Sequence, residues 1–219
     1  DQRLSEFDIR EYLGDQPLMI NLGIAQVEQL IYSKETERIE KLISKLRADG
    51  LIIHINPLQE WVQPEGDRIL MSPIATIASL VDMATYPIIV KEVGQGFGPE
   101  SLKALFQLPL AAIDLAGYGG TNFSKLELTR SGDLRKQSMA AVLGLGHDCD
   151  EMISYINELM DREEPLACKQ VIISGGVSSI DDIKKAKELN NNNIEGIIVG
   201  KAIYDGDIKL EELVKELDA

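Results

Sequence analysis

The sequence predicts an α/β fold of the TIM (β/α)8 barrel type. Three observations predict it: short apolar runs alternate with segments of helical periodicity, the runs are apolar at successive positions, and glycine or polar residues gather where each run stops. Strands buried on both faces and alternating with helices are typical of a parallel sheet covered by helices. Polar residues after every strand favour a barrel, whose active site uses the carboxyl ends of its strands. A doubly wound open sheet is the alternative, and it would gather its ligand residues at one switch point.

Six apolar runs are predicted strands, and they lie at residues 17–21, 51–56, 87–91, 111–115, 170–174 and 196–199. Helical spacing predicts helices over residues 36–46, 72–83, 99–108, 149–163, 181–189 and 207–217. The segment 139–146 fits either a strand or a buried helical turn. A full barrel typically takes about 250 residues. We therefore expect residues 1–219 to form a single barrel domain that is N-terminally incomplete and lacks the first two strands.

Charge and composition restrict the class of protein. The formal net charge of −14 argues against a nucleic-acid surface, because neutralising phosphates requires clustered lysine and arginine. An anionic ligand must therefore be held locally, by backbone N–H groups, a few cations or a metal. No apolar run approaches the ~18 residues of a membrane helix. The two cysteines, Cys149 and Cys168, have no metal-binding spacing, and we expect reduced thiols in a cytoplasmic protein.

The stretch HINPLQE, residues 54–60, places several polar side chains at the end of a buried strand. His54 and Asn56 are expected on one face of that strand, and Gln59 and Glu60 on the loop that follows Pro57. An amide can fix a ligand without adding charge, and a neighbouring carboxylate can hold Mg²⁺, which prefers oxygen ligands. The alternative is a capped loop with a histidine that is satisfied by its neighbours. The density of polar groups favours a binding site.

Two further strand ends carry single residues of interest. Lys91 closes the apolar run Pro-Ile-Ile-Val. A lysine there needs an anion or an electron-rich ligand, because desolvating its charge is unfavourable. Glu92 is the alternative partner. Thr121 follows a glycine-rich loop that would let backbone approach a flat ligand, and its hydroxyl can donate a hydrogen bond.

The last two strand ends resemble a phosphate cradle. Gly175 and Gly176 follow one strand, and Gly200, Lys201 and Ala202 follow the next. Exposed N–H groups of neighbouring loops and a helix N-terminus bind phosphate. Barrels commonly place a phosphate after their last two strands. We therefore expect a phosphate site here.

Several stretches resemble the type 2 isopentenyl-diphosphate isomerases. These are HINPLQEWVQPEGDR, PIIVKEVGQGFGPESL and AAIDLAGYGGTNFSKLE, together with DQPLMINLGIAQVE and GHDCDEM. The resemblance covers residues 1 to about 178. It implies a barrel flavoprotein of isoprene biosynthesis that interconverts isopentenyl and dimethylallyl diphosphate with FMN and Mg²⁺, and NADPH as reductant of the flavin. It also implies a cytoplasmic homo-oligomer, a tetramer or an octamer.

The resemblance also implies roles for residues of this chain. Gln59 would be catalytic, through proton transfer or positioning, and Glu60 would bind the Mg²⁺ that meets the diphosphate. The other implied contacts are His54, Asn56 and Gln59 with the substrate, Asn21, Lys91 and Thr121 with the flavin, and Gly175, Gly176, Gly200, Lys201 and Ala202 with its phosphate.

The C-terminal part has a second resemblance. From about residue 175 the chain is similar to the final βα units of the barrel sugar isomerase of histidine biosynthesis, and both families use this quarter for phosphate. One alternative is therefore a truncated or recombined barrel that keeps a phosphate or FMN site without turnover. Another is an aldose–ketose isomerase, which needs a carboxylate pair on the first and fifth strands. The sequence offers no place for the first of these carboxylates.

Overall fold

The computed structural model describes residues 4–130, 132–162, 165–188 and 193–217. They contain a six-stranded parallel sheet in the order β1-β2-β3-β4-β5-β6. The strands are β1 (Met19–Gly23), β2 (Gly50–His54), β3 (Ile88–Lys91), β4 (Ala112–Asp114), β5 (Val171–Ser174) and β6 (Ile194–Ile198). Each strand pairs with its neighbours in the sequence, as in a barrel, whereas a doubly wound sheet reverses its order. The predicted barrel-type α/β fold and its six strands are confirmed.

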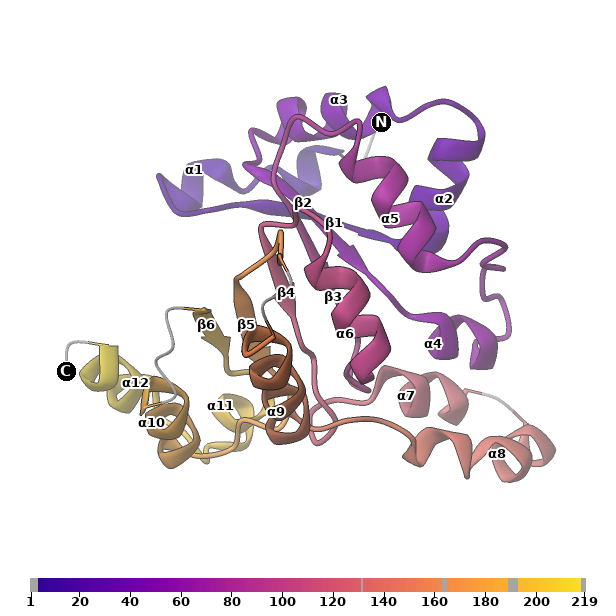
Figure 1. Cartoon of the computed structure of the whole chain (residues 1–219). Helices are drawn as coiled ribbons and strands as arrows, with labels where there is room; N and C mark the ends of the chain where they lie inside the picture. The colour runs from indigo at the N-terminus through magenta and orange to yellow at the C-terminus, as the bar shows by residue number, and fades with distance from the viewer. Residues whose placement is uncertain (1–3, 131, 163–164, 189–192, 218–219) are drawn as a thin grey trace.

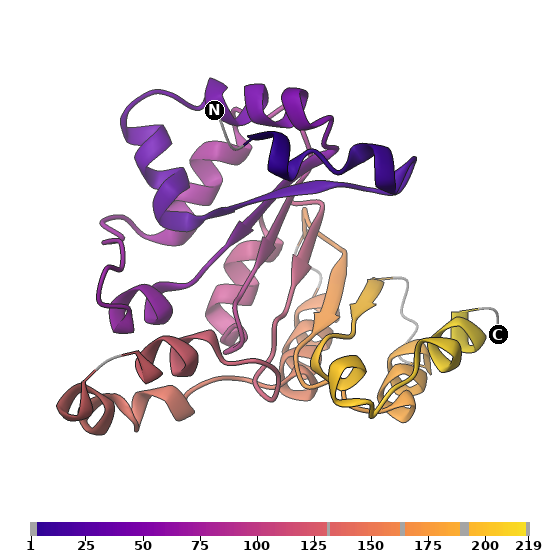
Figure 2. The same ribbon diagram turned by 180° about the vertical axis from the view of Figure 1, so that it is seen from behind.

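At least one helix follows each strand. These helices are α2 (Ile24–Tyr32), α5 (Pro73–Val81), α6 (Pro99–Phe106), α9 (Cys149–Met160), α10 (Ile180–Glu188) and α12 (Leu210–Leu217), with α3 (Glu37–Leu46) preceding β2. Helices α2, α5, α6 and α9 contact one another in that order. Figure 1 shows α5, α6 and α9 in front of the strands, and Figure 2 shows the sheet from behind. The long helices therefore cover one face of the sheet.

The predicted helices are confirmed to within a few residues at each end, and the predicted ends at positions 163 and 189 lie outside the described residues. The segment 139–146 is helical, because it contains a short 3-10 helix, η2 (Val142–Gly144). The remaining elements are η1 (Leu4–Phe7), α1 (Arg10–Leu13), α4 (Pro57–Val62), α7 (Phe123–Thr129), α8 (Asp133–Met139) and α11 (Lys201–Asp205).

Helix α9 illustrates how the sequence sets an element. Asp148 caps it, accepting from the Glu151 N–H, while the Glu151 side chain accepts from the Asp148 N–H. This reciprocal arrangement satisfies two N–H groups that lack partners within the helix. Met152, Ile156 and Leu159 are buried at helical spacing against the sheet and α6. Burying one such side chain contributes about 1.5–3 kcal/mol.

Alternation along the strands gives the sheet two different faces. In β2, Leu51 and Ile53 are buried in the main core between sheet and helices, whereas Ile52 and His54 are half-buried on the opposite face. The parallel register pairs His54 with Lys91, and Lys91 with Asp114. Register partners share a face. The carboxyl ends of β2, β3 and β4 thus present a polar row on the face that the long helices leave uncovered.

A second, small core lies beside these strand ends. Val62 of α4, Leu128 of α7 and Leu143 of η2 pack together. Arg130 also bonds Glu65 at 2.6 Å and Glu127 at 2.6 Å, which ties the end of α7 to the segment after α4. Helices α4, α7 and α8 form a group at one end of the sheet, visible in both views (Figures 1 and 2). Within the described ranges, no helix has the length and apolar character needed to cross a bilayer.

Candidate functional site

The polar row at the strand ends forms one side of the site. The Nδ1 atom of His54 lies 2.6 Å from Oδ1 of Asn21 on β1. Asn21 and His54 were both predicted site residues, and the structure brings them into direct contact. Because an amide oxygen only accepts, Nδ1 of His54 carries a proton in this hydrogen bond.

His54 is influenced by two charged residues of the site, Lys91 and Glu60. Burial lowers the pKa of His54, the positive charge of Lys91 lowers this pKa further, and the negative charge of Glu60 opposes the shift. A lowered pKa keeps the imidazole neutral near pH 7. The parallel register places Lys91 beside His54, and Glu60 accepts from Asn56, two residues after His54, so Lys91 and Glu60 both lie near the carboxyl end of β2.

Three predicted substrate and metal residues lie together around the start of α4. Here the structure corrects the prediction: Asn56 lies beyond the end of β2, and Gln59 and Glu60 lie on a helix rather than on a loop. Pro57 is the physical reason, because its fixed φ is pre-organised for the first helical turn. Asn56 Nδ2 donates to Glu60 Oε1 at 2.7 Å and to Gln59 Oε1 at 3.4 Å.

This cluster has an oxygen atom without a partner. Asn56 is 3% exposed, and its Oδ1 atom is buried without a hydrogen bond. Glu60 Oε1 and Oε2 accept from Asn56 and from the Asp67 N–H, the latter at 2.7 Å. The described residues contain no group of three His, Cys, Asp or Glu side chains able to hold a metal. One carboxylate and one amide oxygen do fit Mg²⁺, which commonly binds through one or two carboxylates, water and substrate phosphates.

Lys91 and Glu92 have separate roles. Lys91 Nζ donates to the backbone carbonyl of Glu92 at 2.5 Å rather than to its carboxylate. That carboxylate is buried, and its Oε2 accepts from the N–H groups of Val93, Gln95 and Gly96 at 2.6, 2.6 and 3.2 Å. Burial raises the pKa of Glu92, and these N–H groups oppose the rise. Glu92 therefore shapes the loop after β3 and is not the ion-pair partner of Lys91.

A cavity of about 380 Å³ lies between the loops that follow β3 to β6. Its volume falls within the range of small-molecule pockets. Seven residues predicted to contact the flavin or its phosphate line it: Lys91, Thr121, Gly175, Gly176, Gly200, Lys201 and Ala202. The eighth, Asn21, does not line this cavity and lies against His54 instead. Four loops distant in sequence thus converge on one pocket.

Glycines allow two of these loops to touch. Gly175 has φ +83°, and a Cβ atom there would lie 2.2 Å from the carbonyl oxygen of Gly117. A Cβ on Gly120 would lie 2.8 Å from the Gly175 Cα. The thiol of Cys149 supports this contact, donating to the carbonyls of Ser174 at 3.2 Å and Gly175 at 3.3 Å. The close approach leaves backbone exposed to the pocket, as a cradle for phosphate requires.

The side chain of Lys201 is already paired. Its ammonium lies 2.5 Å from Asp205 Oδ2, one helical turn further along α11, and the side chain is 70% exposed. A phosphate in this part of the pocket would therefore be held mainly by backbone N–H groups at the start of α11 and in the loop after β5.

Sequence reasoning missed one buried acid in the pocket wall. Asp114, the last residue of β4, is 3% exposed and accepts a hydrogen bond from the Ser174 hydroxyl. Burial raises the pKa of Asp114, whereas Ser174, the charge of Lys91 and the Ala116 N–H oppose the rise. In the sequence Asp114 is hidden in the apolar run Ala-Ala-Ile-Asp-Leu. An acid at the end of a buried strand is the signal that could have found it.

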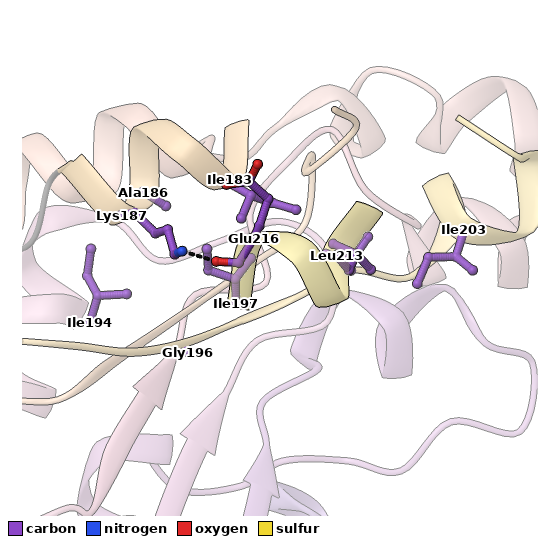
Figure 3. Close-up of a pocket in the computed structure, with 10 residues that line it drawn as sticks. Ile183, Ala186, Lys187, Ile194, Gly196, Ile197, Ile203, Leu213 and Glu216 are labelled. Carbon is purple, nitrogen blue, oxygen red and sulfur yellow. Dashed lines mark hydrogen bonds between the residues drawn. The ribbon is translucent and has the colours of Figure 1, made fainter. Parts of the chain in front are cut away.

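A larger cavity, of about 740 Å³, lies among α10, β6, α11 and α12. Figure 3 shows its mostly aliphatic lining, with the Lys187 ammonium donating to the backbone carbonyl of Glu216. None of the predicted site residues lines it. Its lining offers neither the converging glycine loops nor the strand-end polar groups of the smaller pocket, which is therefore the better candidate site.

Comparisons with known proteins give one match to the C-terminal part of the chain and others that extend over most of it. Residues 155–209 match the family model described as histidine biosynthesis protein. The isopentenyl-diphosphate delta-isomerase of Pseudescherichia vulneris is 35% identical over 83% of this chain and 50% of its own length. Those of Synechocystis sp. and Rickettsia akari are 37% and 31% identical, over 61% and 97% of this chain and 38% and 59% of theirs.

Among solved structures, a HpcH/HpaI aldolase/citrate lyase family protein from Burkholderia cenocepacia covers 100% of this chain and 98% of its own, with a TM-score of only 0.29 and 11% identity. So low a likeness says nothing about the site. The chain spans about half the length of the curated relatives it matches. The expected resemblance to isopentenyl-diphosphate isomerases is confirmed over most of the chain, and its C-terminal part is confirmed as similar to the histidine-biosynthesis barrels.

Proposed function

We infer that this chain carries out, or contributes to, the interconversion of isopentenyl and dimethylallyl diphosphate with FMN and Mg²⁺. The relatives are named isopentenyl-diphosphate delta-isomerases, and the product, FMN and Mg²⁺ come from the family resemblance. One observation carries the proposal: the parallel register pairs His54 with Lys91, and Asn56, two residues after His54, donates a hydrogen bond to Glu60. A metal-bound diphosphate beside Glu60 would therefore lie next to a flavin beside Lys91, as a reaction between the two requires.

On the substrate side, the proposed residues surround the start of α4. Glu60 and the free Oδ1 atom of Asn56 would supply oxygen ligands to Mg²⁺. Gln59 lies next to them on α4 and would position the hydrocarbon end of the substrate. A glutamine amide is a poor base, so Gln59 would hold the reacting group rather than remove its proton.

On the cofactor side, the pocket between the loops after β3 to β6 would hold FMN. Lys91 and Thr121 would contact the ring, and the glycine loops around Gly175, Gly176 and Gly200 its phosphate. Reduced flavin, when bound, supplies the acid/base chemistry that the surrounding side chains lack. The use of NADPH as reductant and the assembly into tetramers or octamers rest on the family resemblance alone.

The direct test is product formation by the purified chain. Isopentenyl diphosphate is added with FMN, NADPH and Mg²⁺ in the absence of oxygen, and dimethylallyl diphosphate is quantified, with mixtures lacking FMN or Mg²⁺ as controls. Product that depends on both supports the proposal. Flavin binding without product favours a barrel that retains a cofactor site without turnover, and neither binding nor product refutes the proposed function.

A matched pair of variants tests the cofactor assignment separately. Lys91→Met removes the cation from the pocket wall, and FMN affinity is expected to fall about tenfold or more. Lys169→Met removes an exposed lysine before β5, and FMN affinity should stay unchanged. Equal affinities of the two variants for FMN would show that Lys91 does not contact the cofactor.

A further inference from the structure

The buried carboxylate of Asp114 is a group that the proposed function has not used. It ends β4, is in register with Lys91 on β3, and lines the same cavity. Neighbouring strands lie about 4.8 Å apart. An anion and a cation therefore stand side by side on the floor of the pocket.

The position of this carboxylate is fixed from one side. Its Oδ1 atom accepts from the Ser174 hydroxyl and, at 3.3 Å, from the Ala116 N–H, which also lies 3.0 Å from Ser174 Oγ. Asp114 and Ser174 are both buried. Among the described residues, no hydrogen bond to the second oxygen, Oδ2, is present. The Asp114 carboxylate is thus fixed through Oδ1, and its Oδ2 atom can accept a hydrogen bond from a ligand.

Lys91 does not neutralise this acceptor by direct contact. Within the described part of the chain, no ion pair joins the two side chains, and the ammonium of Lys91 donates to the Glu92 carbonyl instead. A buried carboxylate is stable only when hydrogen bonds or charges compensate its desolvation. The pocket floor thus offers one fixed donor and one fixed acceptor, each able to bind one more group.

We propose that Asp114 is a ligand-binding residue whose Oδ2 atom accepts a hydrogen bond from a ring N–H, while Lys91 donates to the adjoining carbonyl oxygen. A planar heteroaromatic ring with an imide edge has this order of donor and acceptor, and the isoalloxazine ring of a flavin carries such an edge. This inference rests on the proposed FMN site. It adds the residue that selects the ring by its N–H group.

The test compares two ligands on the full chain freed of cofactor: FMN, and FMN methylated at its imide nitrogen. Methylation removes the N–H group and leaves the phosphate and the carbonyls in place. The wild type should bind methylated FMN about ten- to a hundredfold more weakly, the effect of one hydrogen bond to a charged group. Asp114→Asn should bind FMN more weakly by a similar factor and discriminate little between the two ligands. Lys91→Met, as the control, should weaken both ligands alike.

The possible results separate the two claims. If the wild type binds FMN but methylation leaves its affinity unchanged, Asp114 does not accept the N–H, and only this inference falls. If Asp114→Asn still discriminates as the wild type does, another group accepts the N–H, which also overturns it. If FMN does not bind at all, the proposed function falls with it. Should Asp114→Asn fail to fold, the comparison of the two ligands on the wild type decides alone.

Discussion

Replacing Gly175 by alanine should lower the free energy of unfolding and weaken ligand binding in the pocket. Two features of Gly175 are responsible, and glycines that have only one of them or neither serve as comparisons. Gly175 combines a positive φ of +83° with a close approach of 2.2 Å to the Gly117 carbonyl oxygen. Gly206 has a positive φ of +81°, but a Cβ atom there would meet nothing within 4 Å. Gly196 has neither feature. The three alanine variants therefore form a graded series.

The expected free energies of unfolding follow from these geometries. A left-handed conformation costs a non-glycine residue roughly 1–2 kcal/mol, and the lower entropy of the unfolded chain returns about 0.4–1 kcal/mol. Gly206→Ala should thus lose about 0.5–1 kcal/mol. Gly175→Ala must in addition displace the backbone at Gly117, which adds about 1–3 kcal/mol as for other overpacking changes. Gly196→Ala should lie within about 0.5 kcal/mol of the wild type.

Urea unfolding followed by circular dichroism measures this series, and FMN titration of each folded variant measures the pocket. Gly175→Ala should show the largest loss of stability and weaker FMN binding, because the displaced loop lines the pocket. Gly206→Ala should lose stability without a comparable loss of FMN affinity. A Gly175→Ala variant as stable as Gly206→Ala would refute the steric argument, and unchanged FMN affinity would refute the role of this loop.

Three further predictions concern side chains of the site. Glu60→Gln should weaken the response to Mg²⁺ and diphosphate about tenfold or more and leave FMN affinity unchanged. Loss of FMN binding instead would show that Glu60 is not the metal ligand. Glu158→Gln, which changes an exposed residue of α9, is the control. The pKa of His54 lies below its ordinary value of 6.5, so the folded state binds fewer protons than the unfolded state, and stability should fall as the pH drops below about 6.5. His54→Gln should flatten this fall in urea unfolding between about pH 7.5 and pH 5.5, and an unchanged pH dependence would contradict the assignment. Burial raises the pKa of Cys149 from 9.0 to about 11, which leaves about a hundredfold less thiolate. In a Cys168→Ala background, iodoacetamide should therefore alkylate the folded protein far more slowly than the urea-unfolded chain. Equal rates would show that the Cys149 thiol is accessible and reactive in the folded state.

Strands were the most predictable elements because each is apolar at successive positions and ends at a polar or glycine residue. Helix α2 was not predicted, since it follows β1 at Gly23 with no intervening loop to separate the two elements. Helix α4 was expected to be a loop, because six residues show too little periodicity to reveal a helix. Pro57 was interpreted as the end of a strand, although it also marks the start of a helix.

The candidate pocket was predictable to a similar degree and for a related reason. Residues that end a strand or come soon after it, such as Lys91, Gly175 and Gly200, were expected at a common mouth, and all three line the same cavity. Their roles stay predictions. The contact between Asn21 and His54 could not be derived from the sequence alone, because it depends on how β1 and β2 are aligned.

The pairing of Lys91 with Asp114 shows why alignment of the strands carries the chemistry. Side chains alternate between the two faces, so a slip of one residue between β3 and β4 would bring Ile113 beside Lys91 on the pocket floor and turn Asp114 into the apolar core. The observed register instead leaves Val90 and Ile113 in that core. A charged Asp114 among those side chains would lack the Ser174 hydroxyl that now stabilises it. The polar pair therefore opposes the slipped register, and the same contacts that define the pocket floor also specify how these two strands align.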